Sequence, residues 1–401
     1  MNDENRLRGK PKIAIVHDYL NQYGGGERVL QALNEIWPDA PIYTSVYDKK
    51  LMRGWLKIDE SLIHTNLVSH LPFSNYLTKH YFFMYPIAFR MQDVGDADIV
   101  ISNTSYAAKF AKGKKGSVHI CYIFTPPRFL WGYDTELVRY YSRPFDRFLH
   151  PLYNILVPPA KKILQKADYY AAQKVDFFAS ISKEIAKRVK KHYGRESAVI
   201  YPPVDTDRFA KVSSIRGRIF EESKSKYQVS SKKDYFLVVS RLGGYKKVDI
   251  VVEAFNKLGL PLKIVGDGPQ LSYLKGVAKK NIELLGRLPD EEVTKLVSSC
   301  TALIFPTHED FGIVPVEAMA AGKPVISFSR GGAAETIVEG VSGVFFDKQT
   351  PQAIIETVKR FDPSAYKAEA CRSQAKKFSK EEFKERFKFF VEEAWQKRSN
   401  L

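Results

Sequence analysis

The chain of 401 residues contains only three cysteines, and no two of them form a CxxC pair. This excludes a disulfide framework and a cysteine-based zinc site, and it indicates a reducing compartment. The sequence has no run of about eighteen apolar residues, so no transmembrane helix is predicted. Its first residues are polar and lack the apolar segment of a signal peptide. These absences predict a cytoplasmic protein.

Acidic residues are outnumbered, since 62 Lys and Arg face 45 Asp and Glu, for a formal net charge of +17. Such a balance predicts an anionic partner: a phosphorylated substrate, an acidic membrane surface or nucleic acid. No RNP, KH or helix-turn-helix pattern is present, which argues against nucleic acid. The glycines after the first predicted strand do not fit G-x-G-x-x-G, which argues against a Rossmann oxidoreductase.

The length predicts two domains, each large enough to bury its own core. Short apolar segments alternate with amphipathic ones throughout the chain, which predicts two doubly wound α/β domains. The linker is predicted at 202–205, where two prolines stiffen the chain. The predicted domains are therefore residues 1–203 and 204–375, followed by a C-terminal helix at 376–401.

The stretch 303–335 is the predicted working centre of the chain. A strand at 303–305, a polar loop at 307–311, a helix at 312–321 and a second strand at 324–328 follow one another. In a parallel sheet, the start of such a helix offers unpaired N–H groups to an anion. Glu309 and Glu317 lie on either side of this point, and carboxylates accept hydrogen bonds from sugar hydroxyls. The alternative is that Glu317 complements the helix dipole and Glu309 is a solvated charge.

Two further loops are candidates for binding an anion. Three glycines and Glu27 precede a predicted helix at 28–37, and glycines let a backbone approach a ligand closely. Arg241 and Lys246 lie five residues apart after a predicted strand at 235–240, a spacing at which both can reach one diphosphate. The alternatives are a flexible turn in the first case and two exposed bases in the second.

Other patterns have simpler interpretations. The aromatic and basic stretch 71–91 is predicted to be a helix packed into the core, with a membrane-surface or single-stranded nucleic acid site as the alternative. Ser182 is predicted to cap a basic amphipathic helix at 183–193, whose charged face is expected to be solvated. Asp96 and Asp98 form a D-x-D at the start of a strand, where a turn is expected, and we assign no metal to them.

The segment EDFGIVPVE, followed by AMAAGKPVI and GGAAE, closely resembles the signature of retaining GT-B glycosyltransferases of family 4. The resemblance implies that Glu309 contacts the donor sugar, that Glu317 contacts the donor ribose, and that Arg241 and Lys246 stabilise the leaving diphosphate. The other donor-side residues it implies are Phe311, Gly312, Ile313, Val314, Gly266, Gly268, Leu285, Gly25 and Gly26. It also implies an active site between the two domains and a final helix, 383–395, that returns to the N-terminal domain.

The segment TPPRFLW at 125–131 resembles an acceptor-side motif of the same family, CHTPxRYLW. Phe124 occupies the position of the family's histidine, and its ring can neither accept a proton nor hydrogen-bond a sugar. The acceptor-side residues implied by the resemblance are Gly24, Glu27, Pro126 and Arg128.

The function implied is retaining transfer of a hexose, with mannose from GDP-mannose expected first and UDP-sugars next. The expected acceptor is a saccharide or lipid-linked hydroxyl at the inner face of the cell membrane, with peripheral contact to anionic lipid. No cofactor beyond the nucleotide sugar, no metal and no nucleic acid partner is expected. A non-catalytic sensor of sugar nucleotides would carry similar binding residues and stays an alternative.

Overall fold

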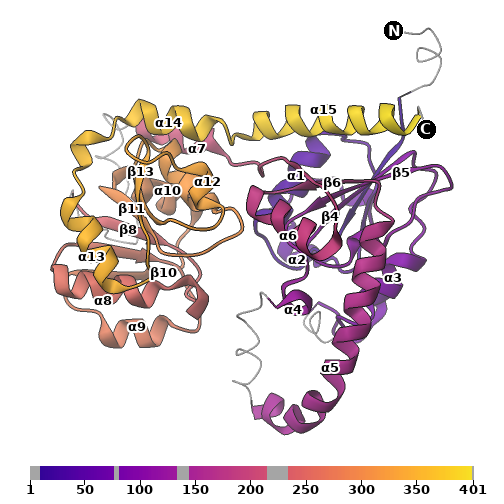
Figure 1. Ribbon diagram of the computed structural model, residues 1–401, viewed down its shortest axis with the longest axis horizontal. Coiled ribbons are helices and arrows are strands. Elements are labelled where there is room, and N and C mark those ends of the chain that lie inside the picture. Colours follow the sequence, from indigo (N-terminus) through magenta and orange to yellow (C-terminus); the bar gives the residue numbers. More distant parts are fainter. Residues whose placement is uncertain (1–9, 76–80, 133–143, 215–233, 400–401) are drawn as a thin grey trace. The chain divides into compact units, whose positions relative to one another are not determined.

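The computed structural model describes residues 10–75, 81–132, 144–214 and 234–399. It divides into two compact units (Figure 1). The N-terminal unit combines Met1–Pro203 with Phe383–Leu401, and the C-terminal unit is Val204–Glu382. The chain thus enters the C-terminal unit after Pro203 and leaves it before Phe383.

The N-terminal unit contains a seven-stranded parallel sheet in the order β3-β2-β1-β4-β5-β6-β7. The order reverses between β1 and β4, and open parallel sheets bind their ligands beyond the carboxyl ends of the strands at such a point. The strands are β1 (Ile13–His17), β2 (Ile42–Thr44), β3 (Ile63–Thr65), β4 (Ile99–Thr104), β5 (Val118–Ile123), β6 (Phe177–Ser180) and β7 (Ala198–Val199).

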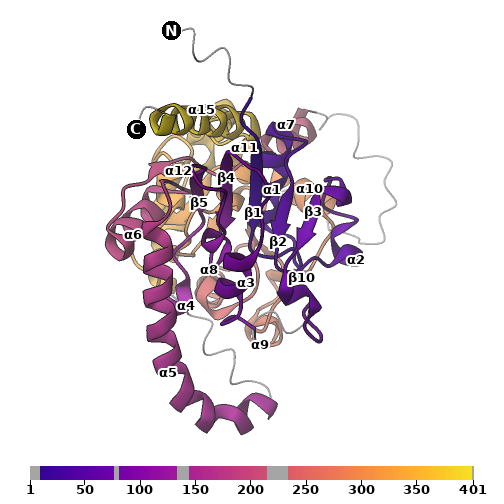
Figure 2. The ribbon, with the colours of Figure 1, turned by 90° about the vertical axis from the view of Figure 1, so that its right-hand side faces the viewer.

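The helices of this unit vary widely in length. They are α1 (Gly25–Ile36), α2 (Lys49–Met52), α3 (Tyr85–Met91), α4 (Arg128–Trp131), α5 (Pro144–Gln173), α6 (Lys183–Tyr193) and, from Phe383 onward, α15 (Lys380–Ser399), with short 3₁₀ turns η2 (Glu60–Leu62), η3 (Leu67–His70) and η4 (Ala108–Phe110). The first part of α5 projects away from the sheet in both views (Figures 1 and 2). The Ser182 side chain accepts a hydrogen bond from the backbone N–H of Ile185, so the predicted cap of α6 is confirmed.

Helix α15 packs on the N-terminal unit through two buried phenylalanines. The rings of Phe383 and Phe387 lie 5.7 and 5.3 Å from the ring of Tyr122 on β5, measured between centroids. Lys384 forms an ion pair with Glu35 at 3.2 Å. The apolar spacing of this helix therefore serves burial against β5 and α1.

The C-terminal unit contains a six-stranded parallel sheet in the order β10-β9-β8-β11-β12-β13, which reverses between β8 and β11. Its strands are β8 (Phe236–Val239), β9 (Leu262–Val265), β10 (Ile282–Gly286), β11 (Ala302–Phe305), β12 (Val325–Phe328) and β13 (Gly343–Phe346). Its helices are α7 (Thr206–Ser214), α8 (Val248–Leu258), α9 (Leu271–Val277), α10 (Asp290–Ser299), α11 (Ile313–Ala320), α12 (Ala333–Thr336), α13 (Pro351–Arg360) and α14 (Ala368–Lys376), with 3₁₀ turns η6 (Gly244–Lys246) and η7 (Pro363–Ala365).

The predicted fold class, two Rossmann-like doubly wound α/β domains, is confirmed. The prediction for 71–91 is wrong in part. Within the described residues of that stretch, only Tyr85–Met91 is an α-helix, and the side chains of Phe73, Phe83, Ile87 and Met91 are exposed. Helical spacing indicates that one face of a segment is apolar, but not that every apolar side chain is covered.

Candidate active site

The carboxyl edge of the C-terminal sheet brings together two segments that were predicted separately. The segment after β8 carries Arg241 and Lys246, and the segment after β11 carries Glu309. The Lys246 ammonium and the Glu309 carboxylate form an ion pair, with side chains only 15% and 22% exposed. The Thr307 hydroxyl donates to the carbonyl of Lys246 at 3.1 Å, which also joins the two segments. Arg241 is exposed in the segment after β8. Glu309 is therefore paired, and the alternative of a solvated charge does not hold.

The start of α11 depends on the glycine that precedes it. Gly312 has φ 88°, in the left-handed region that favours glycine, and no side chain caps the helix. A Cβ at Gly312 would lie 3.3 Å from the ring of Phe305, so the turn is also tightly packed. Ile313 and Val314 form the half-buried first turn, whose N–H groups have no acceptor within the helix. This turn can bind an anion through backbone atoms.

Glu317 lies in the second turn of α11 and is 6% exposed. The interaction between a carboxylate and the helix dipole is strongest in the first turn, which in α11 holds no acidic residue. The dipole interpretation of Glu317 is therefore the weaker one.

Two glycines after β9 let its turn pack on the segment after β8. Gly266 has φ 140°, and a Cβ there would lie 1.8 Å from the carbonyl oxygen of Ser240. Gly268 has φ 157°, and its Cβ would lie 2.6 Å from the carbonyl oxygen of Leu242. The Gly266 N–H donates to the carbonyl of Gly286 at 2.8 Å. Half-buried Leu285 precedes Gly286 in β10, so all three candidate residues belong to this edge of the sheet.

Phe311 and two further glycines complete the segment after β11. The Phe311 side chain is 4% exposed and its ring lies 5.9 Å from that of Phe378, so it can serve a ligand only through its backbone. Gly332 donates its N–H to the carbonyl of Glu309 at 2.7 Å, and a Cβ there would lie 2.2 Å from the Cα of Phe311. We did not assign a role to Gly331 or Gly332 from the sequence, although both belong to the GGAAE segment.

In the N-terminal unit, a polar cluster lies where the order of the sheet reverses. His17 ends β1, Asn103 lies in neighbouring β4, and Glu27 lies in the first turn of α1. The Asn103 amide nitrogen donates to the carbonyl of Gly26 at 3.3 Å and lies 3.1 Å from Nδ1 of His17. Nδ1 therefore accepts, and the imidazole proton is on Nε2, which faces Glu27 at 3.8 Å. Neither His17 nor Asn103 was a candidate from the sequence.

The glycines beside this cluster lie in a helix and not in the predicted loop. Helix α1 begins at Gly25, three residues before the predicted start, with Gly24 as its N-cap. A Cβ at Gly26 would lie 3.2 Å from the ring of Phe124 and 3.6 Å from that of His17. Close packing, not a positive φ, is thus the reason for glycine at position 26. Glu27 is 3% exposed, so its carboxylate faces His17 and not solvent.

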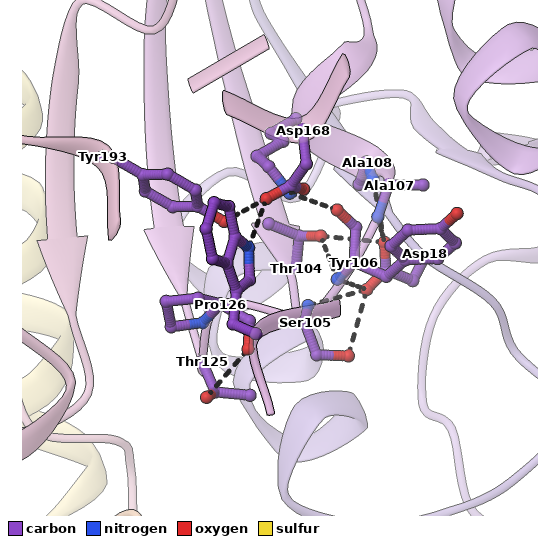
Figure 3. A network of polar contacts seen from close by, with 12 residues as sticks. Asp18, Thr104, Ser105, Tyr106, Ala107, Ala108, Thr125, Pro126, Asp168 and Tyr193 are labelled. Carbon is purple, nitrogen blue, oxygen red and sulfur yellow. Dashed lines mark hydrogen bonds and ion pairs between the residues drawn. The ribbon is translucent and has the colours of Figure 1, made fainter. Parts of the chain in front are cut away.

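Buried polar contacts fix the position of the TPPRFLW segment (Figure 3). Pro126 is buried, whereas Arg128 is exposed at the start of α4. The carboxylate of Asp168 on α5 accepts from the Trp131 indole at 2.9 Å and from the Tyr193 hydroxyl at 2.7 Å, and it pairs with Lys109 at 2.6 Å. Burial, followed by the nearby Asp168 charge, raises the pKa of Tyr193 well above its usual value.

A second carboxylate in Figure 3 fixes the loop after β4. Asp18 accepts the backbone N–H groups of residues 105–108 at 2.7 to 2.9 Å and the hydroxyl of Thr104 at 2.8 Å. Because Asp18 directly follows β1, this loop is fixed to the same edge of the sheet as His17.

Asp96 and Asp98 lie near the start of β4, where both pair with Lys114 at 2.8 Å. Hydrogen bonds from Lys114 lower the pKa of both carboxyls. Among the described residues, no group of three His, Cys, Asp or Glu side chains is placed to hold a metal ion. No helix of the described residues is both long enough and apolar enough to cross a bilayer.

Comparison with known proteins identifies relatives of the C-terminal unit and of the whole fold. Residues 219–378 match the family model described as glycosyl transferases group 1. The chain is 29% identical to a GDP-mannose-dependent alpha-(1-6)-phosphatidylinositol monomannoside mannosyltransferase of Mycolicibacterium smegmatis, over 51% of this chain and 56% of that protein. It is 25% identical to the alpha-1,3/1,6-mannosyltransferase ALG2 of Dictyostelium discoideum, over 61% of this chain and 62% of that protein. The match thus spans less than two thirds of either relative.

Among solved structures, Anabaena Alr3699/HepE in complex with UDP has a TM-score of 0.65 at 17% identity, covering 95% of this chain and 100% of that one. This similarity establishes the GT-B fold. The group 1 match at 219–378 and the similarity to mannosyltransferases support the resemblance to family 4 glycosyltransferases.

Proposed function

We propose that the protein transfers a hexose from a nucleotide sugar to a hydroxyl of a saccharide or lipid-linked acceptor, with retention at the anomeric carbon. The observation that carries the proposal is the ion pair between Lys246 and Glu309. It lies next to the start of α11, at the point where the C-terminal sheet reverses its order. A cation and the N–H groups of a helix start can bind a diphosphate, and a carboxylate can accept hydrogen bonds from the hydroxyls of its sugar.

The chemical barrier lies in separating a nucleoside diphosphate from an oxocarbenium-like sugar. Lys246, Arg241 and the N–H groups that follow Gly312 would stabilise the charge that develops on the departing diphosphate. Removing one such contact typically costs about 3 to 4 kcal/mol of transition-state stabilisation. Because these groups are part of the protein, the scheme needs no metal, and EDTA should leave turnover unchanged.

Retention would follow from attack on the face from which the diphosphate leaves. In this scheme the departing phosphate oxygen takes the proton of the acceptor hydroxyl, and the new glycosidic bond forms as the sugar–phosphate bond breaks. Glu309 would contact the sugar hydroxyls and Glu317 the ribose. Proton NMR of the first product formed should therefore show the anomeric configuration of the donor.

GDP-mannose is the proposed donor, with UDP-sugars as the alternative. The printed name of the Mycolicibacterium smegmatis relative specifies GDP-mannose, and that of the Dictyostelium discoideum relative specifies mannosyl transfer. The Anabaena fold neighbour binds UDP, which keeps the second donor class in the test.

The test is a thermal-shift panel with GDP, UDP, ADP and their sugars on the wild type and on Glu317→Gln. A ligand at a hundred times its Kd adds about 2.7 kcal/mol of stability. We expect GDP compounds to stabilise the wild type and to lose most of this effect in Glu317→Gln. Glu356→Gln is the matched control, since Glu356 is exposed on α13, and it should respond as the wild type does.

Two results would contradict the proposal. Absence of a shift with every nucleotide would refute the donor site. A clear shift without transfer of labelled mannose to any lipid-linked or soluble saccharide would favour a sensor of sugar nucleotides.

A further inference from the structure

We propose that a surface around α3 in the N-terminal unit docks on an anionic lipid bilayer. We call it the α3 surface and define it by Phe73, Phe83, Ile87, Arg90 and Met91. The inference extends the proposed function, on which it rests in one respect: a lipid-linked acceptor is the reason for an enzyme of this kind to sit on a membrane.

The apolar side chains of the α3 surface are unusually exposed. The exposed fractions are 74% for Phe73, 52% for Phe83, 60% for Ile87 and 66% for Met91. Ile87 and Met91 are four residues apart on α3, and Phe83 lies four residues before Ile87 in the turn that leads into the helix. Side chains at this spacing share one face of a helix. Ile87 and Met91 therefore form an apolar stripe on α3, and Phe83 lies in the turn directly before it.

The opposite face of α3 is firmly packed. Tyr85, Ala88 and Phe89 are buried in the core of the N-terminal unit. The Tyr106 hydroxyl donates to the carbonyl of Phe82 at 2.7 Å, which holds the turn before α3 in place. The helix is thus apolar on both faces, and only one of them is used by the fold. A helix at a water-exposed position is normally polar on its outer face, so the stripe indicates an interaction.

Phe73 adds a second, independent observation. Its φ of 53° lies in the left-handed region, which bulky side chains rarely adopt. The Tyr81 hydroxyl donates to the carbonyl of Pro72 at 3.0 Å, which ties this turn to the segment that leads into α3. A phenylalanine that is both strained and 74% exposed gains little from folding. We infer that the Phe73 side chain inserts into the bilayer.

The charge around the stripe favours anionic lipid over a protein with a basic face. Residues 61–92, which lie between Glu60 and Asp93, contain no Asp or Glu, and the described residues of this range include Arg90, His64 and His70. Arg90 is exposed on α3 next to Met91. Exposed aromatic and aliphatic side chains beside a cation are typical of surfaces that lie in the headgroup region of a membrane.

The experiment is flotation of the full-length protein with two kinds of vesicle. One kind is pure phosphatidylcholine, and the other is phosphatidylcholine and phosphatidylglycerol in equal parts. We expect the wild type to float with the anionic vesicles, less at high salt, and little with the neutral ones. The variant Ile87→Ser with Met91→Ser should reduce the bound fraction about tenfold or more, because both side chains would be buried in the interface.

Two further variants separate docking from folding. Phe73→Asn should lower vesicle binding while keeping or raising the Tm, since asparagine tolerates the left-handed region better than phenylalanine. A structural role for Phe73 would lower the Tm instead. Phe389→Ser is the matched control, because Phe389 is 63% exposed on α15, and it should float as the wild type does.

Three outcomes would overturn the inference: no flotation of the wild type, equal flotation of all variants, or loss of self-association in the α3 variants with vesicle binding unchanged. The last result would assign the surface to a second copy of the chain. All variants should keep the thermal shift with the donor nucleotide. A wild type that floats but shows no such shift would refute the proposed function and leave the membrane surface standing.

Discussion

Lys246 and Glu309 form an ion pair although 62 residues separate them in the sequence, since they follow the two strands between which the C-terminal sheet reverses its order. If Lys246 binds the diphosphate, it does so in competition with Glu309. We expect Lys246→Met to lower kcat by about a hundredfold to a thousandfold, as removal of one stabilising donor typically does.

The partner variant should separate binding from turnover. In Glu309→Gln, the charge of Lys246 is no longer neutralised, so a nucleoside diphosphate should bind as tightly as to the wild type or more tightly, while kcat falls. Calorimetric titration with the diphosphate and initial rates with the sugar donor measure the two effects. A parallel loss of affinity and rate would show that Glu309 supports the diphosphate site directly.

A methyl group at Gly266 should destabilise the C-terminal unit. Its Cβ would lie 1.8 Å from the Ser240 carbonyl oxygen, at a φ of 140° that side chains rarely adopt. We expect Gly266→Ala to cost about 2 kcal/mol or more in the free energy of unfolding, measured with urea. The control is Gly276→Ala in α9, where nothing lies within 4 Å of the new Cβ. That change should stabilise the protein by about 0.5 to 1 kcal/mol.

The buried pair between Lys109 and Asp168 should be costly to break from one side. Both side chains are fully buried, and the Asp168 carboxylate also accepts a hydrogen bond from the Trp131 indole. Lys109→Met alone should cost about 3 to 5 kcal/mol because it leaves a carboxylate unpaired. The double variant Lys109→Met with Asp168→Leu should be less destabilised than the sum of the single variants. Additive losses in urea unfolding would show that the two charges do not interact.

Stability should fall in acid in part because of His119. Burial lowers the pKa of this imidazole to about 4, against 6.5 when it is unfolded. Between these values the unfolded chain binds a proton that the folded chain does not, so stability is lost as pH falls from about 6.5 to 4. The loss reaches about 3 kcal/mol at most. The His119→Gln variant should show a smaller difference in urea stability between pH 7 and pH 5 than the wild type.

Much of the fold follows from local patterns in the sequence. Helix α6 has the predicted limits because Ser182 caps its start and Gly194, with φ 67°, ends it. The group at the start of α11 could be located because its residues are nearly contiguous, so their geometry depends on a single strand, loop and helix.

Contacts between distant segments could not be read from the sequence. In the sequence, nothing distinguishes Asn103 from other polar residues in buried strands. The pairing of β4 with β1 brings Asn103 next to His17, which lies 86 residues away in the sequence. The start of α1 was misplaced because glycine disfavours helices, whereas the close approach of Phe124 decides the residue at position 26. Phe311 was predicted from its neighbours in the motif, but its side chain belongs to the core.

The return of the chain to the N-terminal unit makes the C-terminal unit an inserted domain. Val204 donates its N–H to the carbonyl of Phe378 at 3.1 Å and forms a bridge with Ser379, so the two ends of the insertion lie side by side. The C-terminal unit could therefore be exchanged for that of a relative as one segment, with both junctions close together. A single cut at the linker would instead remove Phe387 from the N-terminal core and leave Tyr122 uncovered.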